Sequence, residues 1–423
     1  MRTRRAGADD RCRMFMWSHG FFRGMSANSA ILDGVTVLEV GTFLTAPKPA
    51  RYLAEFGAEV VKVERTSGSP FRHSATHGEP VDGTTPLQAI INSGKKSLAV
   101  DIASDEGHEI FMRLARDADV LLENMSPGAM DRLGIGYEDV AAVNDEIIYC
   151  SISGYGKTGP WKDRKAVDFM AQGMSGLPYQ NALRAGGGEP SLSGWFAADE
   201  LTTAYVTISV LAALLGGEGT HIDISMFDVM LAGFSDQAAS YSSGMNIEPP
   251  GGPSRTEGPR GIYPTATEPL TLDVLPPTPE RWTAFWDLLG LDEWVEEGRY
   301  RTVQEITADR EFVERRVTEQ FRTRPREEWL DLLWDAGFIA APVLTVEEAF
   351  EHEQLDHRRV REWAHDDRIG DYLQLNFPAM FSAYGMRDLD QAADLGAHTR
   401  ELLERAGYSA SEIEAFYDDG IVA

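Results

Sequence analysis

The 423-residue sequence predicts an α/β protein whose larger domain is built on a parallel β-sheet. Between residues 35 and 153, short apolar runs rich in β-branched residues alternate with segments of helical spacing. Strands and helices that alternate in this way form βαβ units, whose strands lie parallel. A stretch rich in proline and glycine at residues 246–264 interrupts the pattern and indicates a second, smaller domain beyond it.

The pattern opens with three predicted strands and a helix. VTVLEV (35–40) is a β-rich apolar run, and PARYLAEF (49–56) has helical spacing and is followed by Gly57, which favours the end of a helix. EVVKV (59–63) and SLAVDI (97–102) predict two further strands. Ligands of parallel sheets bind at the carboxyl ends of the strands, so the loops after these runs are candidate site segments.

The pattern continues with a helix that Ser104 opens and that carries acidic residues in its first turn. A strand ending near Asn124 follows it. Two short helices and the strand EIIYCSIS (146–153) come next, which predicts further strands for the same sheet.

A long apolar helix is predicted over residues 201–215, before the strand HIDIS (221–225) and a helix that begins near Met226. Apolar residues occupy both sides of the long helix, so we expect it to be buried nearly all round. Asp199 stands at its N-terminal edge, where free N–H groups and the helix dipole stabilise a carboxylate. The pattern alone therefore predicts that Asp199 is an N-cap.

The chain is expected to divide into a large and a small domain. Residues 1–29 are predicted to be a disordered extension, and residues 30–240 the large domain, which residues 360–423 complete. Residues 241–264 are predicted to be a linker, and residues 265–359 the small domain.

Composition excludes several classes of function. A net charge of −28 argues against nucleic acid or an anionic membrane as a partner, since phosphate binding needs a basic face. No apolar run is long enough to predict a transmembrane helix. Two cysteines give neither a disulfide framework nor a metal cluster, so we expect a cytoplasmic protein without a metal site.

Two further motifs are weighed against simpler interpretations. Gly154, Gly156 and Gly159 form G-x-G-x-x-G after a strand, but Pro160 and the residues after it do not continue as the helix that a dinucleotide site needs. This loop is better interpreted as a flexible wall beside a site. Asp168 is a second carboxylate near the loop, and its simpler interpretation is a helix cap.

In order along the chain, these segments resemble the class III coenzyme A-transferase family, which includes formyl-CoA:oxalate and carnitine CoA-transferases and the α-methylacyl-CoA racemases. The resemblance runs from Ile31 to Val422. Its most specific segments include LDGVTVLEV, LAEFGAEVVKVE, ADVLLENMSPGAMDRLGIGYEDV, VDFMAQGMSG, FAADE and GTHIDISMFD. The resemblance implies a Rossmann-like large domain, a smaller α+β domain and an interlocked homodimer.

The resemblance also implies a chemistry for Asp199, which matches the catalytic aspartate of the transferases. In that chemistry the aspartate attacks an acyl-CoA thioester to form a mixed anhydride, and the CoA thiolate then gives an aspartyl-CoA thioester. A carboxylic acid acceptor reverses these steps. No cofactor is bound permanently, since the CoA thioester is a substrate, and a helix N-terminus is expected to keep the carboxylate ionised.

The matching positions imply a CoA site with a locally basic set of residues. Arginine suits bidentate phosphate binding, and such a set would accept a polyanionic ligand despite the overall negative charge. The residues expected to contact CoA are Thr42, Phe43, Arg65, Val100, Asn124, Met125, Arg132, Lys165 and Met226.

Two alternatives stay open. The racemases of the family use a paired acid and base, for which Asp168 is a possible member, but no histidine lies between His108 and His221. An epimerase or an intramolecular CoA isomerase belongs to the same alternative. The second is a CoA-binding protein without catalytic activity, since a fold does not fix a function.

Overall fold

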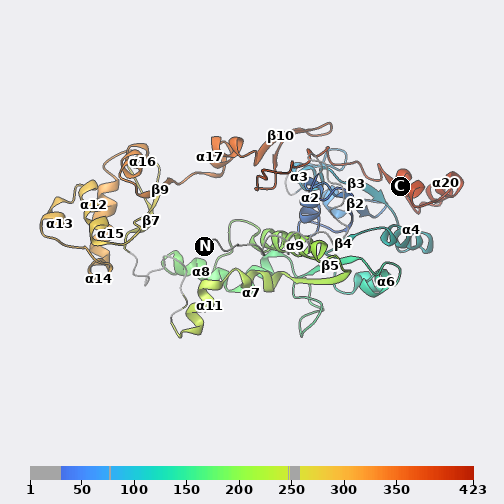
Figure 1. Ribbon diagram of the computed structural model, residues 1–423, viewed down its shortest axis with the longest axis horizontal. Coiled ribbons are helices and arrows are strands. Elements are labelled where there is room, and N and C mark those ends of the chain that lie inside the picture. Colours follow the sequence, from blue (N-terminus) through green and yellow to red (C-terminus); the bar gives the residue numbers. More distant parts are fainter. Residues whose placement is uncertain (1–29, 76–77, 246, 248–257) are drawn as a thin grey trace, which may run out of the picture. The chain divides into compact units, whose positions relative to one another are not determined.

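The computed structural model describes residues 30–75, 78–245, 247 and 258–423 (Figure 1). The predicted extension, residues 1–29, and residues 248–257 of the predicted linker lie outside the described residues. The chain forms two compact units. The first comprises the residues through Ser175, Ser193–Gly233 and Gln354–Ala423, and the second comprises Gly176–Leu192 and Phe234–Glu353.

The first unit is built on a six-stranded sheet in the order β3-β2-β1-β4-β5-β6, with every neighbouring pair parallel. This is the Rossmann order, in which the chain changes direction between β1 and β4 and leaves a crevice at their carboxyl ends. The predicted parallel sheet is confirmed. Its strands are β1 (Thr36–Val40), β2 (Glu59–Glu64), β3 (Lys96–Ala99), β4 (Val120–Glu123), β5 (Ile148–Ser153) and β6 (Thr220–Ser225).

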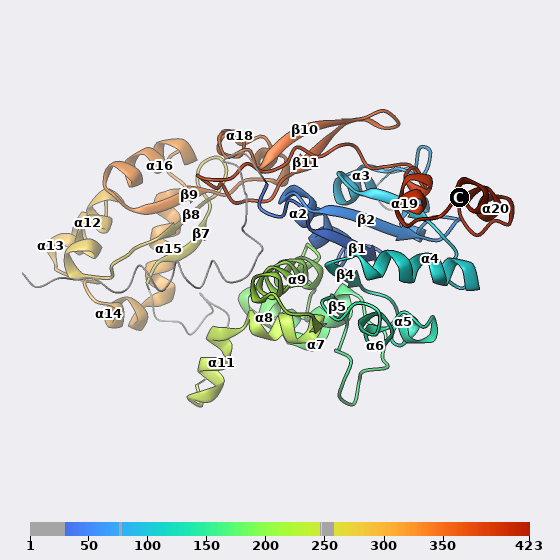
Figure 2. The same cartoon turned by 45° about the vertical axis from the view of Figure 1, so that its right-hand side comes forward.

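One face of the sheet packs against helices from both ends of the chain (Figure 2). Side chains alternate between the faces of a strand, so Leu38 and Val40 point to this side while Val37 points to the other. Val422, at the C-terminus, pairs with Val100. The helices here are α4 (Asp105–Arg116), α5 (Ala129–Arg132), α6 (Tyr137–Ala141), α19 (Thr399–Arg405) and α20 (Ala410–Asp418). As predicted, Ser104 caps α4, its Oγ accepting the Gly107 N–H at 3.0 Å.

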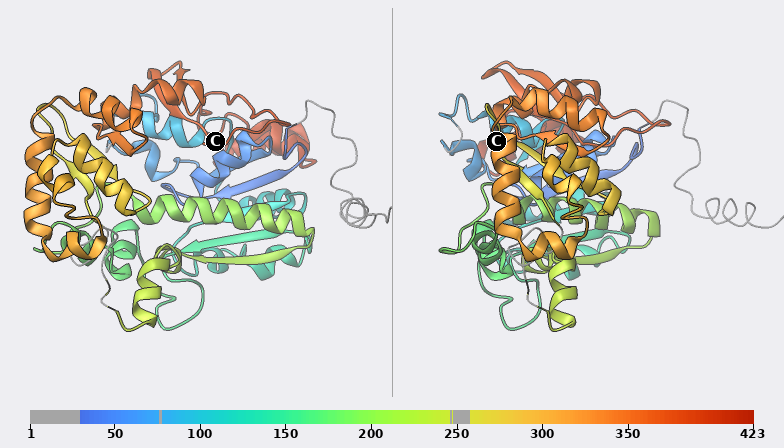
Figure 3. Two further views of the ribbon diagram at one scale, coloured as in Figure 1. Left: turned by 60° about the vertical axis from the view of Figure 1, so that its left-hand side comes forward. Right: turned by 90° about the vertical axis from the view of Figure 1, so that its left-hand side faces the viewer.

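The opposite face packs against the long predicted helix and its neighbours. That helix is α9 (Ala197–Gly216), which lies alongside the strands (Figure 3) and contacts α2, α7 and α10. The other helices of the unit are α2 (Pro47–Glu55), α3 (Pro86–Asn92), α7 (Asp168–Ser175) and α10 (Met226–Ala232), with the short 3-10 helix η2 (Pro70–His73). The short elements η2 and α3 were missed because each spans about one or two turns and shows little periodicity.

The prediction that α9 is buried nearly all round is wrong for the single chain. Val206, Val210 and Leu214 pack into the core, but Ile208 is 61% exposed and Leu215 is 76% exposed. Tyr205, Ile208, Ala212 and Leu215 follow helical spacing and form one exposed stripe. Helix α9 is also long and apolar enough to cross a membrane by length and composition alone. Core helices of globular domains meet the same criterion.

The second unit has its own core around four buried tryptophans, Trp282, Trp286, Trp294 and Trp329. Three antiparallel strands run in the order β7-β8-β9, namely Arg260–Tyr263, Leu270–Asp273 and Ile339–Pro342. The helices are α8 (Leu177–Arg184), α11 (Ser235–Ser242), α12 (Pro279–Leu288), α13 (Asp292–Glu296), α14 (Val303–Ala308), α15 (Arg310–Phe321), α16 (Arg326–Asp335) and α17 (Val346–Phe350). The first of the strands, β7, lies within residues 241–264, for which the sequence predicts a linker.

The last part of the chain returns to the first unit at Gln354, within α18 (Glu353–His357). It begins with an antiparallel pair of strands, β10 (Arg361–Asp366) and β11 (Gly370–Leu375). A segment without regular structure follows, in which Arg387 N–H donates to Glu55 O and His398 N–H donates to Ser97 O. Residues far apart in sequence therefore close the edge of the sheet beside β3.

Candidate active site

A cavity of about 460 Å³ opens at the carboxyl ends of β1, β4 and β5. This is the position at which the strand order predicts a ligand. Its lining combines aromatic and aliphatic side chains with a few charged groups. The lining segments are Thr42–Thr45, Asn124–Pro127, Ile152–Gly154 and Arg164–Phe169, with Phe71, Ser74, Leu87, Phe196, Asp199 and Met226.

Asn124 joins the loops that follow β1 and β4. Its Oδ1 accepts the Thr42 N–H at 2.8 Å, and its Nδ2 donates to Thr42 O at 2.7 Å. Nδ2 also lies 2.8 Å from Thr45 Oγ1. Both ends of the carboxamide are thus engaged inside the protein, so the side chain holds the cavity wall in place.

Phe43 contributes an unusual backbone conformation to that wall. Its φ is 58°, a left-handed value that costs energy for a residue with a bulky side chain. The ring packs edge to face against Phe71, 5.6 Å between centroids. The conformation directs the chain of the β1–α2 loop across the mouth of the cavity, where Thr42, Phe43 and Leu44 all line it.

Asp199 lines the cavity from the first turn of α9. The prediction that it is the N-cap is wrong, because α9 begins at Ala197 and Phe196 occupies the cap position without a side-chain hydrogen bond. Asp199 is therefore the third residue of the helix. Burial, and then the charges of Asp168 and Glu200, raise the pKa of its carboxyl to about 7. Burial thus outweighs the helix N-terminus, which was expected to keep the carboxylate ionised.

Asp168 takes the capping role instead. It is 3% exposed, and its Oδ1 accepts the N–H of Ala198 at 2.8 Å and the N–H of Asp199 at 3.1 Å. Its other oxygen accepts Gln172 Nε2 at 2.5 Å. Gln172, which sequence reasoning missed, accepts in turn from Ser193 N–H and Oγ. The sequence does contain a signal for Gln172, because a residue four positions after Asp168 lies on the same face of a helix and can contact it.

Glu200, next to Asp199, forms an ion pair with a lysine of α2. Lys48 Nζ lies 2.7 Å and 2.6 Å from the two carboxylate oxygens of Glu200. Lys48 is the second residue of α2, directly after the loop that lines the cavity. A cation is thereby fixed beside the first turn of α9.

The glycine-rich loop lacks the following helix that a dinucleotide site needs, as its sequence predicts. No helix follows the motif until α7 begins at Asp168. A Cβ on Gly154 would come within 2.3 Å of Ala166 Cβ, so glycine allows the segment Arg164–Phe169 to cross directly over the strand end. Lys157 N–H donates to both oxygens of Asp223, which ties the loop to β6.

The cavity brings together most of the residues that the resemblance assigns. Eight of them line it: Thr42, Phe43, Asn124, Met125, Lys165, Asp168, Asp199 and Met226. Arg65 and Arg132 are exposed residues outside the lining, and Val100 is buried in the core against α4 and the C-terminus. Phe71, Leu87 and Phe196 were missed, because nothing in their local sequence marks a cavity wall.

No histidine belongs to the lining of this cavity. His221 stacks on Tyr137, 4.7 Å between centroids, and lies 3.0 Å from Ser151 Oγ. His108 Nε2 lies 3.0 Å from Gly134 O. Within the ranges that the structure describes, no group of three or more His, Cys, Asp or Glu side chains could hold a metal ion. The acidic side chains in the cavity lining are Asp168 and Asp199.

Comparison with known proteins places this geometry in a family. The family model of CoA-transferase family III matches residues 32–399. The chain belongs to this family. An acyl-CoA transferase of Fusarium pseudograminearum is 29% identical over 94% of this chain and 89% of its own length. A succinate–glutarate CoA-transferase of Agrobacterium fabrum is 30% identical over 78% of this chain and 84% of its own.

The fold of this family III CoA-transferase also matches solved structures. A CAIB/BAIF family protein from Brucella suis superimposes with a TM-score of 0.79 at 28% identity. The match covers 90% of this chain and all of that chain. The expected family, the transferase class and the Rossmann-like parallel sheet are thereby confirmed.

Proposed function

We propose that this enzyme moves CoA from an acyl-CoA donor to a carboxylic acid acceptor, with Asp199 as the nucleophile. The observation that carries the proposal is the place of the Asp199 carboxyl, which lines the cavity at the crevice of a Rossmann-ordered sheet. The other cavity carboxyl, Asp168, is occupied by hydrogen bonds to backbone N–H groups and to Gln172. Asp199 is the carboxyl that remains available to a substrate.

The first half of the reaction forms two covalent intermediates. A carboxylate oxygen of Asp199 attacks the thioester carbonyl carbon, the C–S bond breaks, and CoA leaves as the thiolate. The thiolate sulfur then attacks the side-chain carbonyl carbon of Asp199 in the mixed anhydride. The C–O bond breaks, the donor leaves as its carboxylate, and Asp199 holds CoA as a thioester.

The second half repeats these steps with the acceptor. Its carboxylate attacks the Asp199 carbonyl carbon and releases the CoA thiolate, which attacks the acceptor acyl carbon of the new anhydride. The product thioester leaves and the Asp199 carboxylate is regenerated, with no net uptake of a proton. Only ionised Asp199 attacks, so a pKa near 7 sets the fraction of active enzyme at neutral pH.

The cavity lining supports an acyl-CoA with an apolar portion and an anionic acceptor. Phe43, Leu44, Phe71 and Phe196 offer apolar surface, and Arg164 and Lys165 bring positive charge to the same wall. A carboxylate acceptor fits beside these cations. Succinate and glutarate are the first acceptors to test, because the Agrobacterium relative is named for them.

The decisive experiment traps the intermediate. The enzyme is incubated with succinyl-CoA and no acceptor, and its intact mass and tryptic peptides are measured. We expect a CoA adduct on the peptide that contains Asp199, released by hydroxylamine, and no adduct on Asp199→Asn. Transferase activity in Asp199→Asn at the wild-type level would refute the nucleophile assignment. Deuterium incorporation at the α-carbon of 2-methylacyl-CoA without transfer would favour racemisation.

We also propose that the enzyme works as a homodimer in the cytoplasm. The exposed stripe of Tyr205, Ile208, Ala212 and Leu215 on α9 supports a second copy, since apolar surface of this kind is commonly covered in an oligomer.

A further inference from the structure

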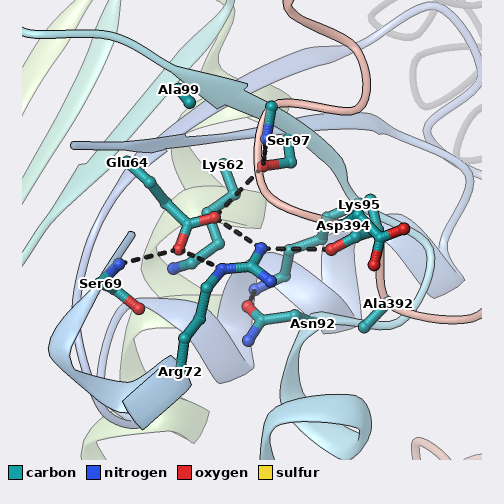
Figure 4. Close-up of polar contacts among 12 residues, drawn as sticks. Lys62, Glu64, Ser69, Arg72, Asn92, Lys95, Ser97, Ala99, Ala392 and Asp394 are labelled. Carbon is teal, nitrogen blue, oxygen red and sulfur yellow. Dashed lines mark hydrogen bonds and ion pairs between the residues drawn. The ribbon is translucent and has the colours of Figure 1, made fainter. Parts of the chain in front are cut away.

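Five charged side chains are buried where β1, β2 and β3 meet the loops of the cavity. Glu39, Lys62, Glu64, Arg72 and Lys95 are each at most 4% exposed. Figure 4 shows four of them, with Arg72 forming a bidentate pair with Glu64 through contacts of 2.8 Å. Three basic side chains face two carboxyl groups, and burial, which Glu39 only partly offsets, lowers the pKa of Lys95 to about 7.

Glu39 is the centre of the part that lies nearest to the cavity loop. One carboxylate oxygen accepts Lys62 Nζ at 2.7 Å and the other accepts Lys95 Nζ at 2.7 Å. Burial alone would raise the pKa of Glu39, but the two ammonium groups outweigh it and lower the pKa. Glu39 is therefore a carboxylate with a lysine on each oxygen.

The two lysines then bind the backbone at both ends of one loop. Lys62 Nζ donates to Gly41 O at 3.1 Å, and Lys95 Nζ donates to Pro47 O at 2.7 Å. The five residues between these carbonyls, Thr42–Ala46, include Thr42, Phe43, Leu44 and Thr45 of the cavity lining. Lys95 completes its three donors with Asn92 Oδ1 at 3.0 Å.

The loop between these anchors is closed tightly. A Cβ on Gly41 would lie 2.7 Å from Ala46 Cβ and 3.1 Å from Glu39 Oε1. The start and end of the loop therefore touch, and its interior residues are pushed outward into the cavity. Asn124 fixes the middle of the same loop through Thr42 and Thr45.

Stability alone does not explain such a cluster. Buried ion pairs contribute little net stability compared with apolar residues of the same volume, because desolvation offsets their attraction. The cluster instead orients the two lysine side chains. Glu39 holds each Nζ so that its remaining N–H groups donate to one backbone carbonyl, Gly41 O for Lys62 and Pro47 O for Lys95. A loop that contacts a substrate benefits from being fixed before binding.

We propose that Glu39, Lys62 and Lys95 are positioning residues that hold Thr42–Ala46 in the conformation that receives the CoA thioester. The inference rests on the proposed function, because it assigns the loop to CoA. None of the three residues lines the cavity, and their contacts with the ends of the loop are those to Gly41 O and Pro47 O.

The test uses the full chain, and free coenzyme A as the probe. In Glu39→Leu/Lys62→Met/Lys95→Met all three charges are removed together, so no single charge stays buried without a partner. We expect the Kd for CoA to rise about tenfold, and the KM for succinyl-CoA to rise with kcat little changed. Amide hydrogen exchange at Thr42–Ala46 is expected to accelerate.

The matched control is a second buried ion pair in the same unit. Arg51 and Glu55 on α2 lie 2.7 Å apart and are at most 2% exposed, but Arg51 donates to Leu375 O instead of the cavity loop. Arg51→Met/Glu55→Leu should leave CoA affinity and loop exchange at wild-type levels. If the triple variant does not fold, Gly41→Ala displaces the loop with all three charges in place and should weaken CoA binding similarly.

The outcomes separate this inference from the function on which it rests. A wild-type enzyme that neither binds CoA nor transfers it overturns the proposed function. If the wild-type enzyme binds CoA, and the folded triple and Gly41→Ala variants keep the same CoA affinity and loop exchange, only the positioning role is overturned.

Discussion

Asp168 accepts a hydrogen bond from the backbone N–H of Asp199, 31 residues further along the chain. The two carboxyl groups are thereby neighbours at the N-terminus of α9, and Asp168 occupies the position where the helix dipole stabilises an anion. For Asp199, the third residue of α9, burial and then the charges of Asp168 and Glu200 raise the pKa to about 7. One carboxylate organises the helix end, and the other is placed for chemistry.

The first prediction concerns Asp168→Asn. The amide oxygen can still accept the N–H groups of Ala198 and Asp199, but the negative charge is gone. The pKa of Asp199 should fall, and the acidic limb of kcat/KM against pH should move to lower pH. Asp168→Ala should show the same shift with a loss of about 1 kcal/mol of stability, because the cap is lost. An acidic limb that stays in place in Asp168→Asn would contradict the electrostatic link.

The second prediction concerns the stability of Asp199→Asn. The pKa of Asp199 is about 7 in the folded protein against an ordinary 3.8, so protonation stabilises the fold below pH 4. That contribution is lost as the pH rises through 7. Asp199→Asn should therefore be more stable than wild type at pH 8, by about 2–3 kcal/mol after allowing for partial exposure. Thermal melting of both proteins at pH 4 and pH 8 measures this difference in stability. A difference between wild type and Asp199→Asn that is the same at both pH values would refute the assigned pKa.

The third prediction concerns Lys48. Lys48→Met leaves Glu200 without its ammonium partner, which lies 2.6 Å away in wild type. The unpaired negative charge should raise the pKa of Asp199 and move the acidic limb to higher pH. Lys48→Arg should keep the wild-type profile, and Lys48→Met/Glu200→Gln should reverse the shift. A double variant that behaves like Lys48→Met would show that charge is not the cause.

The fourth prediction concerns the exposed stripe of α9. Ile208→Glu/Leu215→Glu places two charges on this face without touching the core side of the helix. If a second copy covers the stripe, the wild type should have the mass of a dimer in light scattering and the variant that of a monomer. A surface control on α4, Arg113→Glu, should leave the mass unchanged. A dimer mass for both proteins would place the interface elsewhere, and a monomer mass for the wild type would contradict the homodimer.

The elements of the sheet could be predicted because their residues carry the information locally. VTVLEV and IIYCSIS are predominantly apolar and rich in β-branched residues, as strands buried on both faces are, and Ser104 marks the start of α4. The strand order could not be predicted in this way. It depends on the pairing of β1 with β4, between residues more than 80 positions apart.

The candidate site likewise has features that the local sequence predicts and features that depend on distant contacts. The role of Asp199 came from the resemblance, since its local pattern favoured an N-cap. The contact with Asp168, the pairing of Lys48 with Glu200 and the Glu39 cluster all join distant segments, so no local pattern encodes them. The sequence shows that these carboxyl groups are present, but only the fold explains why the pKa of Asp199 is raised.

The bond between Asn124 and Thr42 has a consequence for how this enzyme could change its substrates. Both polar ends of Asn124 are consumed inside the protein, so recognition at that wall falls to the backbone and to neighbouring apolar groups. Backbone contacts tolerate substitution of side chains. Substitutions can therefore accumulate among other residues of the cavity lining, such as Phe71, Leu87 and Phe196. New acid preferences can arise there while the reactive centre stays the same.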